Sequence, residues 1–217
     1  MGCLIIILHL LYNEYTLFTR TFPEARMRKF LASLLEVLEI AVIAVAAVFI
    51  VRTYLVQPFL VDGTSMYPTF HNDDYVLTDE LTYRIQPPQR GQVIVFHEVG
   101  DPSTYLIKRI IGLPGERIVI KNDTVTIYNK AHPNGFVLDE TYLPPGTVTA
   151  GNIDLTLSSS SYFVMGDNRA VSYDSRSWGP LPAQNIVGMV RFRLWPVTAI
   201  SFFGTPNYPL LSNATSS

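Results

Sequence analysis

The chain has 217 residues, a length that suits one domain with short appendages. Its formal net charge of -2 gives no electrostatic case for binding nucleic acid. Only 16% of the residues are charged and the mean hydropathy is +0.22, and the apolar excess is concentrated near the N-terminus, which points to a membrane. Cys3 is the only cysteine, so an intramolecular disulfide is excluded.

Residues 1–29 precede the main apolar segment and are predicted to lie in the cytoplasm. Three of the residues 26–29 are basic and only Arg52 follows the apolar segment closely, so the positive-inside rule keeps the N-terminus inside. Met27 is also a suitable start for a signal anchor. The sequence therefore leaves open whether residues 1–26 are translated or are an over-extended reading frame.

Residues 30–55 are predicted to form one transmembrane anchor helix. Apolar residues run without interruption from Ile40 to Val51, and the whole apolar stretch approaches the roughly 20 residues that a helix needs to cross hydrocarbon. A buried core helix is the alternative. No small-x-small site precedes a mature start, so the helix is expected to remain uncleaved. We thus expect a single-pass protein of the cytoplasmic membrane, with everything after residue 56 outside the cytoplasm.

Residues 56–204 are predicted to form a mainly β, antiparallel domain, either a sandwich or a coiled barrel. Short β-like runs alternate with turn signals, and no long segment has helical periodicity. Residues 129–161 are predicted to be an extended loop or a smaller β subdomain, and residues 205–217 a flexible tail. The predicted strands are 57–61, 75–78, 92–97, 105–111, 117–121, 124–129, 162–165 and 186–194, with an Asn122-Asp123 hairpin turn between two of them.

Three blocks of residues carry candidate chemistry. The segment Val61-Asp62-Gly63-Thr64-Ser65-Met66-Tyr67-Pro68 places a hydroxyl in a loop, where ordinary turn chemistry is the alternative explanation. The segment Tyr105–Glu116 places Lys108 among apolar residues on both faces of a strand; a solvated lysine at a sheet edge is the alternative. The segment Gly166–Arg176 gathers polar residues after another apolar run. The histidines lack metal-ligand spacing and no cofactor motif is present, so no cofactor is expected.

In this order the three blocks resemble the type I signal peptidases of bacteria, and the resemblance covers Phe59 to Trp195. It implies a membrane-bound serine endopeptidase that removes signal peptides from exported preproteins at small-x-small sites. Ser65 would be the nucleophile and Lys108 the general base of a Ser-Lys dyad. The implied partners are signal peptides and the lipid bilayer, close to the protein translocation machinery.

Further roles follow from the resemblance, residue by residue. Ser172 matches the residue that orients the lysine amine, and Asp174 and Arg176 match a structural ion pair. The Ser65 backbone N–H matches one oxyanion-hole donor. The second donor, in the Gly63 region, is left open because glycine replaces a usual Ser or Thr, and we expect a serine there to be tolerated. The residues that match the substrate pocket are Phe59, Val61, Met66, Phe70 and Ile107.

A lysine can accept the serine proton only when it is neutral. The reference pKa of about 10.4 keeps an ordinary lysine protonated near pH 7. Because both faces of the strand around Lys108 are apolar, we expect burial to lower the pKa of its amine.

Three other interpretations remain open on the sequence. His71 lies six residues after Ser65 and is an alternative base, as in the Ser-His signal peptidases. A membrane-tethered, self-cleaving Ser-Lys regulatory protease is a second alternative, although no DNA-binding domain precedes Val56. A non-catalytic, anchored β-domain surface protein is the third, and it predicts no dependence on Ser65.

Overall fold

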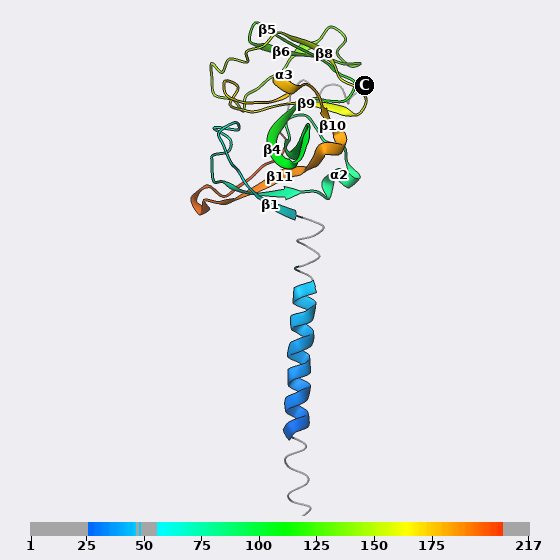
Figure 1. Cartoon of the computed structure of the whole chain (residues 1–217), viewed down its shortest axis with the longest axis vertical. Helices are drawn as coiled ribbons and strands as arrows, with labels where there is room; N and C mark the ends of the chain where they lie inside the picture. The colour runs from blue at the N-terminus through cyan, green and yellow to red at the C-terminus, as the bar shows by residue number, and fades with distance from the viewer. Residues whose placement is uncertain (1–25, 47, 49–55, 206–217) are drawn as a thin grey trace, which may run out of the picture. The chain divides into compact units, whose positions relative to one another are not determined.

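The computed structural model describes residues 26–46, 48 and 56–205. The chain divides into two units, residues 1–51 and residues 52–217. In the first unit, residues 26–46 and 48 are helical (Figure 1), and the large apolar side chains of this helix are exposed. Among the described residues, no helix combines the length and apolarity needed to cross a membrane.

Several predicted segments lie partly or wholly outside the described residues. These are most of the cytoplasmic segment 1–29, residues 47 and 49–55 of the anchor 30–55, and the tail from residue 206. The anchor helix as a whole therefore stays a prediction.

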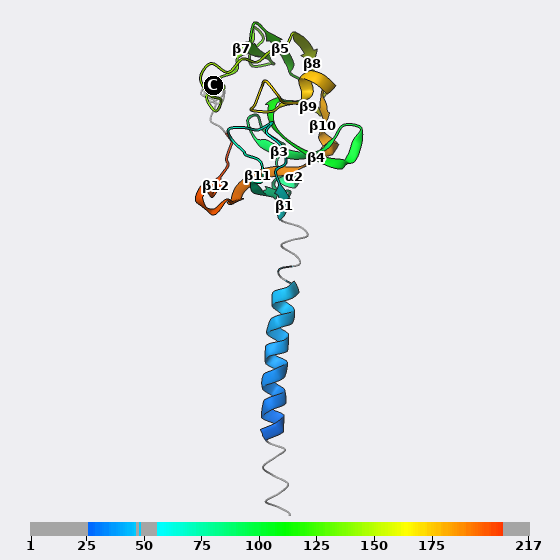
Figure 2. The same cartoon turned by 60° about the vertical axis from the view of Figure 1, so that its left-hand side comes forward.

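Within residues 56–205 the chain forms an eight-stranded and a four-stranded sheet, and all strand pairs in these residues are antiparallel (Figures 1 and 2). The predicted antiparallel β-domain is confirmed. The elements are β1 (Val56–Leu60), β2 (Tyr75–Asp79), α2 (Thr82–Ile85), β3 (Val93–Glu98), β4 (Asp101–Gly112), β5 (Arg117–Lys121), β6 (Thr124–Tyr128), β7 (Phe136–Val137), β8 (Ile153–Thr156), β9 (Ser161–Met165), α3 (Ser175–Trp178), β10 (Leu181–Pro182), η1 (Ala183–Asn185), β11 (Ile186–Trp195), η2 (Val197–Ala199) and β12 (Ser201–Phe202).

The larger sheet has the strand order β1-β2-β11-β3-β4-β9-β10, with β12 beside β11. Strand β4 begins at Asp101, earlier than the predicted residue 105. Asp101 and Pro102, a pair of residue types that usually indicates a turn, lie within this strand. The Asp101 carboxylate accepts hydrogen bonds from the hydroxyls of Ser103 and Thr104, and Asp101 pairs with Glu98 across a β-bulge. Local side-chain bonding thus extends the β3–β4 hairpin beyond its apolar part.

The smaller sheet has the strand order β7-β6-β5-β8. Strands β5 and β6 form the predicted hairpin, in which Lys121 pairs with Thr124. The two turn residues Asn122 and Asp123 have φ angles of 48° and 60°, as a two-residue type I′ turn requires. Strands β7 and β8 come from residues 129–161 and are the outer strands of the smaller sheet.

Three clusters of buried apolar side chains hold the domain together. One joins the two sheets, with Ile118 and Ile127 of the smaller sheet against Phe163 of the larger. A second, on the larger sheet, contains Met66 and Phe70 of the loop between β1 and β2. Full burial of such a side chain stabilises the folded state by about 1.5–3 kcal/mol. The third cluster lies around Ile94, Phe96 and Ile110. The loop that carries Ser65 is therefore fixed by its own apolar side chains.

Gly188 of β11 lies close against β2. A Cβ atom there would lie 2.7 Å from the carbonyl oxygen of Asp79 and 2.7 Å from Thr78 Cγ2. We expect Gly188→Ala to lower the free energy of unfolding by about 1–3 kcal/mol, because backbone must shift to make room. Urea denaturation followed by tryptophan fluorescence measures the change. Gly204→Ala is the control, since its nearest neighbour would lie at 3.7 Å, and equal denaturation midpoints for both variants would contradict the prediction.

Candidate active site

Ser65 lies in the loop between β1 and β2, and this loop is fixed at both ends. The Val61 N–H donates to the Asp74 carbonyl, and the Asp73 N–H donates back to the Val61 carbonyl, each at 2.9 Å. Next to the serine, Met66 is 1% exposed and anchors the loop in the core. Ser65 itself is half-buried. Its hydroxyl is thus held on a rigid support and remains accessible.

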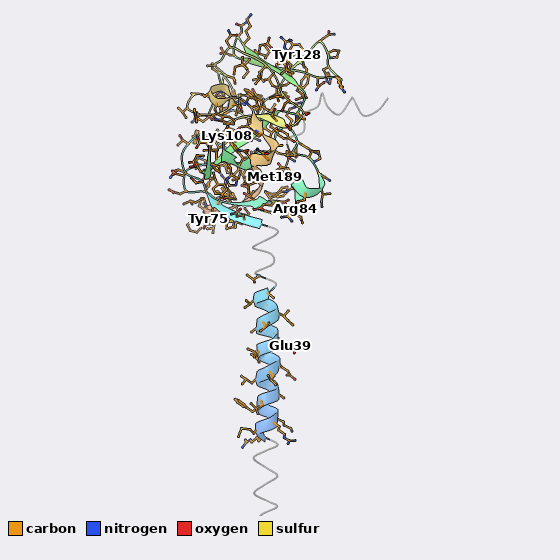
Figure 3. All side chains as sticks on the ribbon, turned by 45° about the vertical axis from the view of Figure 1, so that its right-hand side comes forward. Glu39, Tyr75, Arg84, Lys108, Tyr128 and Met189 are labelled. Carbon is orange, nitrogen blue, oxygen red and sulfur yellow. The ribbon has the colours of Figure 1, made fainter. Side chains whose placement is uncertain are left out.

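Lys108 lies in the middle of β4 and is 3% exposed, and Figure 3 labels it within the body of the β-domain. Its Nζ donates to Ser65 Oγ at 2.8 Å and to the Ile107 carbonyl at 2.9 Å. The structure therefore brings together the two residues that the sequence singled out, which are 43 positions apart.

Burial lowers the pKa of Lys108 from 10.5 to about 8, while the carboxylates of Asp174 and Asp167 act in the opposite direction. With this pKa, about one molecule in ten carries a neutral Lys108 at pH 7, whereas an ordinary lysine is neutral in fewer than about one in a thousand. The expected lowering is confirmed in direction. A neutral amine beside the Ser65 hydroxyl is the pairing needed to activate a serine nucleophile.

The third block lies against the serine loop. The Asn168 N–H donates to the Ser65 carbonyl at 3.0 Å, and Asn168 Nδ2 donates to the Thr64 carbonyl at 3.1 Å. Asp167 accepts two hydrogen bonds from Arg109, from Nε at 2.8 Å and Nη2 at 2.6 Å, and one from Thr69 Oγ1 at 2.6 Å. Asp167 thereby joins the neighbour of Lys108 to the loop that carries Ser65.

Ser172 lies near the Ser65 backbone but forms no hydrogen bond with Ser65 Oγ or Lys108 Nζ. Its hydroxyl is buried and meets no acceptor among the described residues at full hydrogen-bond geometry, although it is near enough to the Asp174 carboxylate to help lower the pKa of that group. A Cβ atom on Gly166 would lie 2.2 Å from Ser172 Oγ and 2.4 Å from the Ser65 carbonyl, so both approach the same glycine. The two hydrogen bonds of the Lys108 amine go to Ser65 and Ile107 instead. The orienting role of Ser172 stays a prediction.

Asp174 and Arg176 form the expected ion pair. Arg176 donates from Nε to Asp174 Oδ1 and from Nη2 to Oδ2, both at 2.8 Å. The buried Asp174 carboxylate also accepts from the Gly166 N–H at 3.0 Å. Although burial raises the pKa of Asp174, the hydrogen bonds from Arg176 and Gly166 outweigh it and hold the pKa below its usual range. The pair therefore fixes the loop that carries Ser172.

A pocket of about 110 Å³ opens beside the pair, with Ser65 and Lys108 both in its wall. Three of the five predicted pocket residues line it: Phe59, Val61 and Ile107. The other lining residues are Leu60, Asp62, Val76, Val95, Tyr105 and Leu106.

Met66 and Phe70 are not in the wall of this pocket, and their role in substrate binding stays a prediction. Their side chains are 1% and 0% exposed and belong to the core cluster that supports the serine loop. Tyr105, which the sequence analysis missed, lines the pocket instead, and its ring packs against Phe59 with a centroid distance of 5.1 Å. Strand alternation was the available signal for it, because it places Tyr105 on the same face of β4 as Ile107, which was predicted to line the pocket.

Two open strand edges flank the pocket. Strand β1 ends the larger sheet and pairs with β2 alone among the described residues. Residues 105–108 of β4 pair with β3, and pairing with β9 begins only at Arg109. An extended peptide can therefore bind as an added strand within reach of Ser65.

Comparison with known proteins agrees with this geometry. The family model described as "Signal peptidase, peptidase S26" matches residues 34–195. The chain belongs to the signal peptidase family. It is accordingly a serine peptidase.

Individual relatives of the signal peptidase family match over most of the chain. A signal peptidase I of Leptolyngbya laminosa is 36% identical over 165 residues, which are 72% of this chain and 77% of the relative. A signal peptidase IB of Staphylococcus aureus strain MRSA252 is 32% identical over 184 residues, 80% of this chain and 95% of the relative. The crystal structure of a signal peptidase I from Enterococcus faecalis V583 has 30% identity and a TM-score of 0.41, and the match covers 48% of this chain and 97% of that chain.

His71, the alternative base, is not placed to act on Ser65 of this signal peptidase. It is exposed, and its ring packs edge-on against Tyr67 with a centroid distance of 5.1 Å. Its backbone N–H donates to Asp74 Oδ2. Hydrogen bonds to Ser65 Oγ from described residues come from Lys108 alone. The geometry therefore favours the lysine as base.

Gly63 departs from the expectation that a serine is tolerated at this position. Its φ is +99°, which side chains other than glycine rarely adopt, although a Cβ atom there would meet nothing within 4 Å. Its N–H donates to Asn72 Oδ1 at 2.7 Å and so is already engaged. The Ser65 N–H, in contrast, donates to no protein acceptor among the described residues. Gly63 thus has a conformational role.

We expect Gly63→Ser to lower activity. Holding a serine at this φ costs about 1–3 kcal/mol. If the loop relaxes to relieve this strain, Ser65, which is only two residues further along the chain, is displaced. The kcat/KM for a preprotein should fall several-fold, and thermal denaturation should show whether the fold persists. A variant as active as the unaltered enzyme would show that the positive φ is not needed.

Proposed function

We propose that this protein is a membrane-bound serine endopeptidase that removes signal peptides from exported preproteins at small-x-small sites, with Ser65 and Lys108 as its catalytic dyad. The observation that carries the proposal is the 2.8 Å hydrogen bond from Lys108 Nζ to Ser65 Oγ at the wall of an apolar pocket. Membership of the signal peptidase family supports the choice of substrate.

The proposed reaction has two stages. Neutral Lys108 takes the proton of Ser65 as Oγ attacks the carbonyl carbon of the scissile bond, and the resulting ammonium gives that proton to the leaving amine. The signal peptide is then an ester of Ser65. Lys108, neutral again, takes a proton from the water that attacks the ester carbon; the ester bond then breaks, the ammonium returns that proton to Ser65 Oγ, and the signal peptide leaves with a free carboxyl group. The Ser65 N–H is the proposed donor to the negative oxygen that forms in each stage.

The pocket supports a preference for small side chains. A volume of about 110 Å³ leaves little room for a large substrate side chain between Phe59, Val61 and Ile107. A peptide added between the two open edges places alternate side chains on one face, so two residues separated by one enter the pocket. That is the spacing of a small-x-small site.

The third block supports the dyad in this proposal. The buried Ser172 hydroxyl is the proposed positioning group for the Lys108 amine, because it lies beside Gly166 together with the carbonyl of Ser65, the residue to which that amine donates. The Asp174–Arg176 pair holds the Ser172 loop in place.

Two features support membrane attachment and a bilayer partner. The helix of residues 26–46 exposes apolar side chains all round, as a segment in lipid does. At the β1 and β11–β12 end of the catalytic domain, apolar side chains also face solvent in number, which marks an interaction surface. The exposed fractions there are 56% for Leu60, 43% for Phe192, 54% for Trp195, 61% for Ile200 and 61% for Phe202. We place the enzyme at the membrane beside the protein translocation machinery, where its substrates emerge.

We expect activity to depend on a neutral Lys108. With the pKa of Lys108 at about 8, kcat/KM should rise with pH through about 8 and level off above it, because protonation removes the base below that value. Lys108→Ala and Lys108→Arg should each lose roughly 10³-fold or more, since guanidinium stays protonated in proteins. Cleavage of a preprotein with an Ala-x-Ala site by the detergent-solubilised full chain is the assay.

Lys121→Arg, at an exposed position of β5, is the matched control and should retain full activity. Ser65→Ala should be inert. Cleavage of the chain itself but not of the preprotein would favour the regulatory protease, and an inert wild type the surface protein. Substantial cleavage by Lys108→Arg together with loss in His71→Ala would move the enzyme to the Ser-His class.

We expect the catalytic domain to lie outside the cytoplasm. Basic residues at 26–29 hold the preceding segment inside, so a protease added to spheroplasts should digest residues 57–205 without lysis. Fragments are followed with an antibody to the β-domain, and a cytoplasmic protein serves as the control for intact cells. Protection of the domain until lysis would reverse the assigned orientation.

A further inference from the structure

Asp62 is the one acidic residue among those that line the active-site pocket. It lies three residues before Ser65, and its side chain is exposed. No described residue forms a hydrogen bond or an ion pair with its carboxylate, whereas Asp74, on the same loop, is paired with Arg193. The Asp74 carboxylate therefore has a structural role in an ion pair, whereas the Asp62 carboxylate has no partner among the described residues.

The orientation of Asp62 follows from its neighbours. Val61 is 5% exposed and packs in the core cluster, together with the partly buried Phe59. Leu60 is 56% exposed. Side chains in an extended segment alternate, so Leu60 and Asp62 share the outer face while Phe59 and Val61 face the pocket floor.

A substrate strand along the β1 edge follows the same alternation. The two small side chains of the cleavage site point to the floor, and the residue between them points to the outer face, beside Asp62. Asp73 is a second exposed charge fixed to this segment, through the hydrogen bond from its N–H to the Val61 carbonyl, and it is also negative. The buried Lys108 amine faces Ser65. The middle side chain of the site therefore meets a negative potential.

We propose that Asp62 is a specificity residue that favours a basic over an acidic side chain at the middle position of the small-x-small site. This inference rests on the proposed function and adds a charge preference to a position that a size-based rule leaves free. Opposite charges on neighbouring strands attract and like charges repel. Since the pair is solvent-exposed, the effect is modest and falls with salt.

The test uses the full chain in a nonionic detergent with three peptides that differ only in the middle residue, Ala-Lys-Ala, Ala-Gln-Ala and Ala-Glu-Ala. At low salt, kcat/KM should fall in that order, with about a fivefold spread between Lys and Glu. Asp62→Asn should bring the three values close together, and Asp62→Lys should reverse the order. Raising the salt concentration should shrink the spread of the unaltered enzyme.

Asp123→Asn is the matched control. Asp123 is exposed, has a φ of 60° that Asn also tolerates, and lies in the β5–β6 turn of the smaller sheet, outside the pocket lining. The Asp123→Asn substitution removes the same charge as Asp62→Asn, and this variant should keep the kcat/KM order of the unaltered enzyme for the three peptides. Equal rates for the three peptides, or an unchanged order in Asp62→Asn, would overturn the inference and leave the proposed function standing. Cleavage by Ser65→Ala would instead overturn the proposed function.

Discussion

Burial of the Lys108 amine carries a free-energy cost that the rest of the domain must offset. Lowering its pKa from 10.5 to about 8 corresponds to about 3 kcal/mol against the protonated form. The folded pKa lies below the unfolded one, so this group adds stability as pH rises from about 8 to 10.5 and contributes its full penalty below about 8. The penalty at neutral pH is offset elsewhere, chiefly by the apolar clusters around β3 and β4. A stable antiparallel framework is thus a condition for a base of this kind.

The same clusters position the nucleophile. Met66 follows Ser65 directly, and its burial fixes the backbone of the serine. On the opposite side, Asn168 donates to the carbonyls of Ser65 and Thr64. The backbone of Ser65 is therefore held by the apolar packing of Met66 and by the hydrogen bonds from Asn168. Its hydroxyl is the group that bonds to Lys108. Precise placement of two reacting groups needs this kind of rigid support.

The sequence predicted those features that depend on local pattern. Alternation around Lys108 predicted its burial, and Asn122-Asp123 predicted the β5–β6 turn. Features that depend on the rest of the fold were missed. An apolar residue next to Ser65 can line a pocket or anchor a loop, and only the packing of Met66 against β3 and β11 decides this. The positive φ of Gly63 likewise depends on how the loop closes.

The carboxylates near Lys108 present a further constraint. Asp167 and Asp174 both act to raise the pKa of Lys108, yet burial still dominates. Each carboxylate is held by a guanidinium, Asp167 by Arg109 and Asp174 by Arg176. A paired carboxylate exerts a weaker field at a distance than a free one, because the field of its partner opposes it. The two ion pairs therefore hold the third block in place while burial still keeps the pKa of Lys108 below its ordinary value.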